Sequence, residues 1–304
     1  MITVRSLTKY YGNIRAIESV SFEIKKAEVV GFLGPNGAGK TTTMQILTGY
    51  LMPTSGTAII DGIDVLADPV NVKKRIGYLP ENTPLYEDLT VYEFLSFIAS
   101  TRGLNGSSAR AIRRVSDICG IHDVLNRTIG TLSKGYRQRV GLAQAIIHDP
   151  KILILDEPTT GLDPLQIREI RALIKELGKE KTIILSTHIL PEVEQTCDRV
   201  IIINQGKIVA DSSIESLKNK TTGKTTVVLK GEVDIDGFRP FGHVEVGETE
   251  GPEVVLTITP ERDRDIREEL YKHCRDKDYT LLELYRERTS LEDIFRQLTT
   301  EAKP

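Results

Sequence analysis

The fold is decided by the stretch Gly34-Pro35-Asn36-Gly37-Ala38-Gly39-Lys40-Thr41, which matches the pattern G-x-x-x-x-G-K-[ST]. The apolar run before it, Val29–Leu33, predicts a strand, and Thr41–Leu51 after it predicts a helix. In this setting the glycines let backbone N–H groups converge on phosphate oxygens, and the start of the helix adds partial positive charge. The stretch therefore predicts a nucleotide site, with Thr42 included, rather than a glycine-rich turn with an incidental lysine.

Two side chains of this loop have expected chemical roles. Lys40 would supply a compact cation to the β- and γ-phosphates. Thr41 would offer its hydroxyl to Mg²⁺, a hard cation that prefers oxygen ligands.

Composition excludes several classes of protein. The chain has 304 residues and a formal net charge of -3, with no basic stripe of the kind that nucleic-acid binding needs. Its cysteines, Cys119, Cys197 and Cys274, lie far apart, which speaks against zinc and disulfides and favours reduced thiols in the cytoplasm. The start of the chain lacks a signal-peptide core, and no run reaches the roughly 18 to 20 apolar residues of a spanning helix. Any membrane role must therefore come through a partner.

Elements alternate along most of the chain. Apolar strands are predicted at Ile76–Leu79, Lys151–Leu155, Thr182–Ser186 and Val200–Ile203, with helices between them and a mostly helical stretch from Thr90 to Ile147. This alternation predicts an α/β fold with a buried, mostly parallel sheet. The polar stretch 218–224 predicts a linker, and residues 225–304 predict a small α+β unit with a final helix from Ser290.

An acidic pair follows one of the apolar strands. Asp156 and Glu157 come directly after Ile152-Leu153-Ile154-Leu155, at the sheet edge where open α/β folds bind ligands. Asp156 would hold Mg²⁺ through its water shell, and Glu157 would polarise the attacking water. His188, after the strand Ile183–Leu185, is a further catalytic candidate because a neighbouring strand would bring it near the γ-phosphate. Taken alone, the acids could mark a strand entering a polar loop and the histidine could be a capping residue.

A third motif identifies a family. Leu132-Ser133-Lys134-Gly135-Tyr136-Arg137-Gln138 resembles the signature LSGGQ of ATP-binding-cassette (ABC) ATPases, and Pro158, Gly161-Leu162-Asp163 and His188 follow it in the family's order. The resemblance covers about residues 1–217. It implies a P-loop NTPase fold with a RecA-like core, a helical subdomain at about 85–150 and an antiparallel β subdomain.

The resemblance also implies ATP hydrolysis in a head-to-tail dimer with ATP and Mg²⁺ as cofactors. Ser133 and Gly135 would contact the γ-phosphate bound by the second ATPase copy, Tyr11 would stack on adenine, and Asp163 would link the two sites. The family further implies integral membrane permease subunits as partners, no nucleic acid, and a location on the cytoplasmic face of the membrane.

The chain departs from the family pattern at three positions. Lys134 and Tyr136 replace the usual glycine and glutamine of the signature, while Ser133 and Gly135 remain. Glu81, at the end of Ile76-Gly77-Tyr78-Leu79-Pro80-Glu81, replaces a usual glutamine that contacts the metal. Its carboxylate keeps an oxygen for Mg²⁺ but adds a negative charge.

Two short segments resemble one branch of the family. The run from Gly77 to Glu81 with Pro84-Leu85-Tyr86, and the tail Ser290-Leu291-Glu292-Asp293-Ile294-Phe295, resemble the ABC-2 type branch, which includes multidrug-export and gliding-motility-associated ATPases. This resemblance implies export. The alternative is a soluble ABC ATPase of DNA repair, chromosome handling or translation. The single cassette and the interval of about 90 residues between Lys40 and Ser133, without heptads or paired cysteines, speak against it. For the residues from about 224 onward, both a regulatory module and a dimer-stabilising appendage remain open.

Overall fold

The computed structural model describes residues 1–219, 223–247, 251–261, 264–286, 292 and 295–296. Its contacts divide the chain into two compact units, Met1–Ile214 and Glu215–Lys303. The boundary lies a few residues before the linker predicted at 218–224, and the short helix α8 (Ile214–Asn219) begins there. Among the described residues, no helix combines the length and apolar character needed to cross a bilayer.

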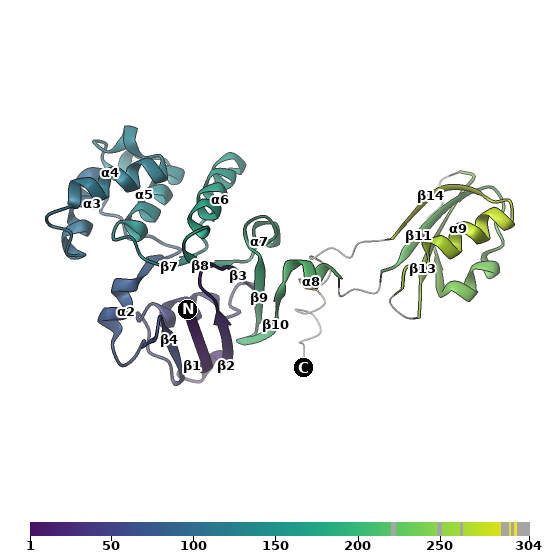
Figure 1. Cartoon of the computed structure of the whole chain (residues 1–304), viewed down its shortest axis with the longest axis horizontal. Coiled ribbons are helices and arrows are strands. Elements are labelled where there is room, and N and C mark those ends of the chain that lie inside the picture. The colour runs from purple at the N-terminus through teal and green to yellow at the C-terminus, as the bar shows by residue number, and fades with distance from the viewer. Residues whose placement is uncertain (220–222, 248–250, 262–263, 287–291, 293–294, 297–304) are drawn as a thin grey trace. The chain divides into compact units, whose positions relative to one another are not determined.

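A six-stranded sheet forms the centre of the first unit (Figure 1). Its order is β10-β9-β3-β8-β7-β6, and all neighbours are parallel except the antiparallel edge strand β10. Every residue of β3 and β7 is buried, as the continuous apolar runs predict for a covered parallel sheet. The strands are β3 (Val29–Leu33), β6 (Ile76–Leu79), β7 (Ile152–Asp156), β8 (Thr182–Thr187), β9 (Arg199–Asn204) and β10 (Lys207–Ser213).

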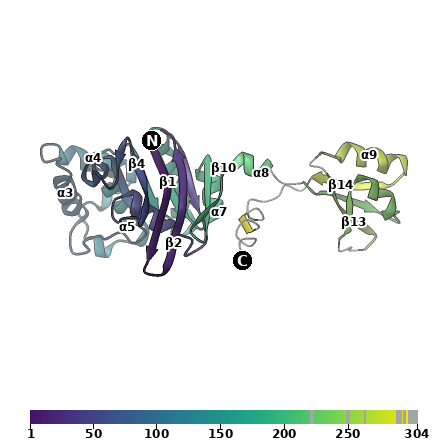
Figure 2. The same cartoon turned by 90° about the horizontal axis from the view of Figure 1, so that it is seen from below.

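A second, antiparallel sheet packs against this core. Its order is β2-β1-β4-β5, and the long strands β1 and β2 run side by side in Figure 2. Phe22 of this sheet meets Phe32 of β3 with ring centroids 5.6 Å apart, inside one apolar cluster that includes Met44 of helix α1. The elements are β1 (Ile2–Tyr11), β2 (Ile14–Ile24), α1 (Lys40–Leu47), β4 (Ser55–Ile60) and β5 (Ile63–Asp64).

The helical region lies between β6 and β7 in the chain. Its first helix begins with a capping box, in which the Thr90 side chain and Glu93 each bind the other's backbone N–H. Its last helix begins at Lys134, with Ser133 as the N-cap. The helices of this region are α3 (Val91–Thr101), α4 (Ser108–Cys119) and α5 (Lys134–Ile146). Outside it, α2 (Pro69–Arg75) comes before β6, and α6 (Pro164–Gly178) and α7 (Leu190–Thr196) follow β7.

Beyond α8, the described residues of the second unit include a four-stranded antiparallel sheet and a ten-residue helix. Its order, β12-β13-β11-β14, is that of a ferredoxin-like split βαβ arrangement in which the 3₁₀ segment η3 takes the place of the first helix. Thr225, at the start of β11, is the register partner of Arg286, at the end of β14. The elements are β11 (Thr225–Lys230), η3 (Ile235–Phe241), β12 (His243–Val246), β13 (Glu253–Thr259), α9 (Arg267–Asp276) and β14 (Thr280–Arg286).

Phe238, Leu256 and Leu270 belong to the apolar core of this unit, and each is fully buried. The final helix predicted from Ser290 lies mostly outside the described residues.

Candidate active site

The loop between β3 and α1 is held in a shape that only glycine permits. Gly39 has φ +107°, and a Cβ placed there would lie 2.5 Å from Cγ2 of Ile17 and 2.8 Å from the carbonyl oxygen of Ala16. Lys40 follows as the first residue of α1. Its Nζ donates to the carbonyl oxygens of Gly34 at 2.9 Å and Pro35 at 3.3 Å, so the amine is folded back over the loop.

The acidic pair lies at the carboxyl end of β7, next to the end of β8. Asp156 is the register partner of Ser186, and the N–H of Glu157 donates to the carbonyl oxygen of Ser186 at 3.1 Å and to its hydroxyl oxygen at 3.2 Å. Glu157 adopts φ +50°, a left-handed conformation that is strained for a residue with a side chain. Strain of this kind is typical of functional sites, because the surrounding contacts must hold it in place.

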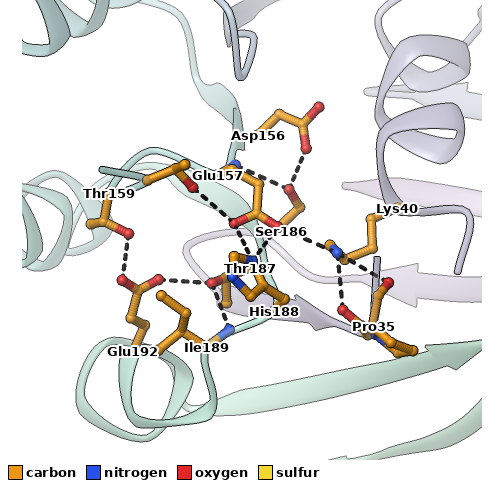
Figure 3. A network of polar contacts seen from close by, with 12 residues as sticks. Pro35, Lys40, Asp156, Glu157, Thr159, Ser186, Thr187, His188, Ile189 and Glu192 are labelled. Atoms are coloured by element: carbon orange, nitrogen blue, oxygen red, sulfur yellow. Dashed lines mark hydrogen bonds and ion pairs between the residues drawn. The ribbon is translucent and has the colours of Figure 1, made fainter. Parts of the chain in front are cut away.

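The Glu157 carboxylate is contacted from three sides (Figure 3). Lys40 Nζ lies 3.3 Å from it, His188 Nδ1 lies 2.9 Å and 3.1 Å from its two oxygens, and the Thr160 hydroxyl donates to it at 3.2 Å. The side chains of Lys40 and Glu157 are both almost completely buried. Glu157 is therefore in direct contact with both Lys40 and His188, the lysine and the histidine that the sequence singled out.

Asp156 has the features of a cation ligand. Its Oδ1 accepts hydrogen bonds from the Ser186 hydroxyl and, at 3.4 Å, from the Thr41 hydroxyl, whereas its buried Oδ2 has no hydrogen-bond partner among the described residues. Burial raises the pKa of this carboxyl group, and the negative charges of Glu81 and Glu157 act in the same direction. An unpaired carboxylate oxygen beside a threonine hydroxyl fits a hard divalent cation such as Mg²⁺.

These residues surround one cavity of about 410 Å³. It combines the glycine-rich loop with Glu81, Glu157 and His188, so phosphate-binding and proton-accepting groups face the same space. Its lining residues are Ala16, Asn36, Gly37, Gly39, Lys40, Thr41, Thr42, Glu81, Glu157, Thr160 and His188.

Comparison with known proteins agrees with this geometry. The sequence profile of the ABC transporter family matches residues 17–160. The ABC transporter ATP-binding protein YxlF of Bacillus subtilis, itself uncharacterized, is 35% identical over 297 residues, which are 97% of this chain and 98% of that protein. The chain belongs to the ABC transporter family.

Two further relatives extend the comparison. The bacitracin transport ATP-binding protein BcrA of Bacillus licheniformis is 40% identical over 250 residues, covering 78% of this chain and 81% of that protein. A solved dimeric ATP-binding cassette in a post-hydrolysis state with ADP and Pi matches with a TM-score of 0.65 and 25% identity, over 70% of this chain and 99% of that one. The predicted fold class and ATPase activity are confirmed: the protein is an ATP-binding ABC ATPase with the P-loop fold.

Several candidate residues of this ABC ATPase do not line the cavity, among them the fully buried Asp156. Tyr11 ends β1 with 45% of its surface exposed, and the Lys9 amine lies 5.3 Å from its ring centroid. Ser133 and Asp163 are the N-caps of α5 and α6, and Gly135 is buried in the first turn of α5. The loop residues Gly34, Pro35 and Ala38 support the cavity without lining it.

Sequence reasoning missed a supporting carboxylate behind the site. Glu192 of α7 is 1% exposed and accepts hydrogen bonds from the Thr159 hydroxyl and, at 2.8 Å, from the Thr187 hydroxyl (Figure 3). It thereby joins the segments that follow β7 and β8. An acid in the first turn of a short helix resembles a solvated residue, so the sequence carries no signal for this role. Ser186 could have been suspected, because it ends a strand two residues before His188.

Proposed function

We propose that this ATPase powers transport, in the direction of export, through separate membrane-embedded permease subunits on whose cytoplasmic side it sits. The observation that carries the driving reaction, ATP hydrolysis, is the contact of Glu157 with both Lys40 and His188 in a cavity formed by the glycine-rich loop. The relative BcrA acts in bacitracin transport, which supports transport, and the resemblance of the run ending at Glu81 to the ABC-2 type branch supports export.

In the proposed mechanism, entry of the triphosphate reorganises Lys40. Its amine is engaged by Gly34 and Pro35 carbonyls and by Glu157. Phosphate oxygens are stronger partners for an ammonium group than neutral carbonyls are. Lys40 would therefore turn to the β- and γ-phosphates and free the Glu157 carboxylate.

Glu157, once released from Lys40, would accept a hydrogen bond from the attacking water and orient it. His188 and Thr160 keep contacts with this carboxylate, so its position remains fixed after the lysine leaves. Thr41, Asp156 and Glu81 would hold Mg²⁺, which when bound neutralises negative charge on the phosphate oxygens.

A second copy of the chain would complete each site. Ser133, Gly135 and Asp163 do not line the cavity of their own copy, and the N-terminus of α5 carries the partial positive charge that attracts phosphate. The matching cassette structure is dimeric and holds ADP and Pi. We infer a head-to-tail dimer in which α5 of one copy faces the nucleotide of the other and the exposed ring of Tyr11 stacks on adenine.

The permease subunits would contact the segment 81–89 and α3. Tyr86 is 52% exposed and packs on Phe94 and Phe97, at centroid distances of 5.9 Å and 5.7 Å. Phe97 and Tyr92 also remain about half exposed. Exposed aromatic rings gathered on one element are typical of protein interfaces.

The test is affinity purification of the protein from detergent-solubilised membranes, with mass spectrometry of the proteins that accompany it. We expect a multi-spanning membrane protein to co-purify. The double variant Tyr86→Ser with Phe97→Ser should lose that protein, whereas Tyr271→Ser, which alters an exposed tyrosine of the second unit, should retain it. Recovery of soluble partners alone, with the protein absent from membranes, would overturn the transport proposal and leave the ATPase assignment standing.

A further inference from the structure

A second cavity, of about 220 Å³, shares a wall with the nucleotide cavity. Glu81 lines both cavities, and Lys134 lines the second one together with Glu87 and Arg137. One carboxylate is thus positioned between the nucleotide site and the first turn of α5. A lysine stands on the α5 side of it.

Lys134 is a cation without a partner among the described residues. It is the first residue of α5, where the helix dipole opposes positive charge. Its side chain lies across Gly161, so close that a Cβ at that position would collide with its amine. Within the described part of the chain, Lys134 makes no hydrogen bond or ion pair, although Arg137 beside it donates to the carbonyl oxygen of Leu132 at 2.7 Å. An anion in the second cavity would offset the positive charge of Lys134 and so reduce this unfavourable interaction.

Glu81 is an anion in the complementary situation. On the nucleotide side it lines the same cavity as Glu157, which is paired with the ammonium group of Lys40, and the buried Asp156 directly precedes Glu157 in the chain. Its charge is close enough to Asp156 to raise the pKa of that group. Like-charge repulsion favours moving Glu81 away from the other two acids whenever no metal ion offsets their charge. In the described residues Glu81, too, lacks a hydrogen-bond or ion-pair partner.

We propose that Lys134 is a positioning residue that draws the Glu81 carboxylate to the α5 side of the shared wall while the metal–nucleotide complex is absent, and releases it when that complex binds. This inference rests on the proposed nucleotide site and adds a competition to it. To bind the Glu81 carboxylate, the metal ion must compete with Lys134. The lysine therefore raises the Mg²⁺ concentration that nucleotide binding requires.

The competition has a structural consequence for α5. Glu81 follows β6 of the central sheet, whereas Lys134 begins the helix that carries Gly135. An ion pair between them ties the first turn of α5 to the sheet edge of the same copy. Transfer of Glu81 to the nucleotide side removes that tie, so loading of the site and freedom of α5 become linked.

The test measures binding without turnover. In chains carrying Glu157→Gln, the fluorescence of N-methylanthraniloyl-ATP is titrated with Mg²⁺, and the Mg²⁺ concentration for half-maximal binding is compared between variants. Lys134→Gln should lower that concentration by about two- to fivefold, the range expected for a partly exposed ion pair. Lys134→Arg, which keeps the cation, should restore the original value. Lys179→Gln, which removes a lysine paired with Glu176 at the far end of α6, should leave it unaltered.

A double-variant cycle separates this mechanism from its rivals. In a chain with Glu81→Gln, the further change Lys134→Gln should have no effect on Mg²⁺ demand. A persisting effect would mean that the lysine acts by long-range charge alone, and an effect abolished by Glu87→Gln in place of Glu81→Gln would make Glu87 the partner. Either result overturns the inference while leaving the nucleotide site intact. Absence of Mg²⁺-dependent binding in every variant would instead remove both the site and the inference.

Discussion

Glu157 is the residue on which we expect hydrolysis to depend. Its carboxylate is buried, touches Lys40 and His188, and belongs to the cavity lined by the glycine-rich loop. Glu157→Gln keeps the size and one oxygen of the side chain but removes a proton acceptor. We expect it to bind ATP and to release phosphate more slowly by a factor of about 10² or more, within the range for loss of a general base.

Steady-state phosphate release, with ATP binding measured in parallel, checks this expectation. The matched control is Glu176→Gln, an exposed glutamate of α6 that pairs with Lys179. An undiminished rate in the Glu157 variant would remove that residue from the catalytic role.

Ser186 joins both acids of the site. Its hydroxyl donates to Asp156 and accepts the N–H of Glu157 at 3.2 Å. Ser186→Ala would leave Oδ1 of the buried Asp156 with only the longer contact to Thr41. We expect the free energy of unfolding to fall by roughly 1 to 3 kcal/mol, the cost of an unsatisfied buried polar group, measured by urea unfolding. An unchanged unfolding midpoint would show that this hydrogen bond adds no net stability.

At the scale of elements, the end of α5 and the start of β6 meet at a partly buried histidine. His148 Nε2 lies 3.1 Å from the carbonyl oxygen of Ile76, and its buried Nδ1 has no partner in the described residues. Burial, followed by the positive charge of Arg102, lowers the pKa of His148 from 6.5 to about 4. The ring is therefore neutral in the folded protein at pH values where it would be charged in the unfolded chain.

This difference predicts a loss of stability in acid. The neutral histidine makes its full contribution to the free energy of unfolding above pH 6.5. That contribution is lost as the pH falls toward about 4, because the unfolded state binds the proton more tightly. We expect a loss of roughly 2 kcal/mol from this residue across that window. His148→Gln, which can still donate to Ile76, should flatten the pH dependence of urea unfolding between these values. An equally steep profile in the variant would assign the acid sensitivity to other groups.

The sequence predicted elements best where the pattern was unbroken. The apolar run of β6 was predicted at Ile76–Leu79, which are its bounds in the structure. Strand β1 escaped prediction because register shifts at three places interrupt its alternation, and β10 escaped because it is a largely exposed edge strand. Helix α1 ends at Leu47, short of the predicted Leu51, because Gly49 adopts φ +65°.

The features of the nucleotide site also differ in whether the sequence could predict them. The loop from Gly34 to Thr41 could be predicted because its residues are contiguous in the chain. The contact of Ser186 with Asp156 depends on the register of β8 against β7, which a single sequence does not fix. Glu192 acts through Thr159 and Thr187, and these contacts also arise only from the fold.

At the scale of the whole molecule, the two units have separate cores. Phe238 is fully buried in the second unit, where its ring lies 4.8 Å from that of His273 between centroids. Phe238→Ala should cost about 3 to 5 kcal/mol, which is enough to unfold a small unit. We expect nucleotide binding by residues 1–214 to persist, because every described residue that lines the nucleotide cavity belongs to the first unit.

Two-step urea unfolding, with and without Mg·ATP, tests this separation. Mg·ATP should raise the urea midpoint for unfolding of residues 1–214 and leave that of the second unit unchanged. Loss of ATP-driven dimerisation in the Phe238 variant would assign the second unit a dimer-stabilising role, and retained dimerisation with altered basal hydrolysis would assign it a regulatory one. A single shared transition would contradict independent folding.

The pairing of Thr225 with Arg286 gives the second unit an unusual modularity. Its sheet starts and finishes on neighbouring strands, so the backbone leaves beside the point where it enters. Residues 225–286 could accordingly be replaced by a tight turn, or exchanged for another small fold whose ends also adjoin, without stretching the flanking chain. A protein engineer could treat this segment as a removable insert and introduce a reporter there.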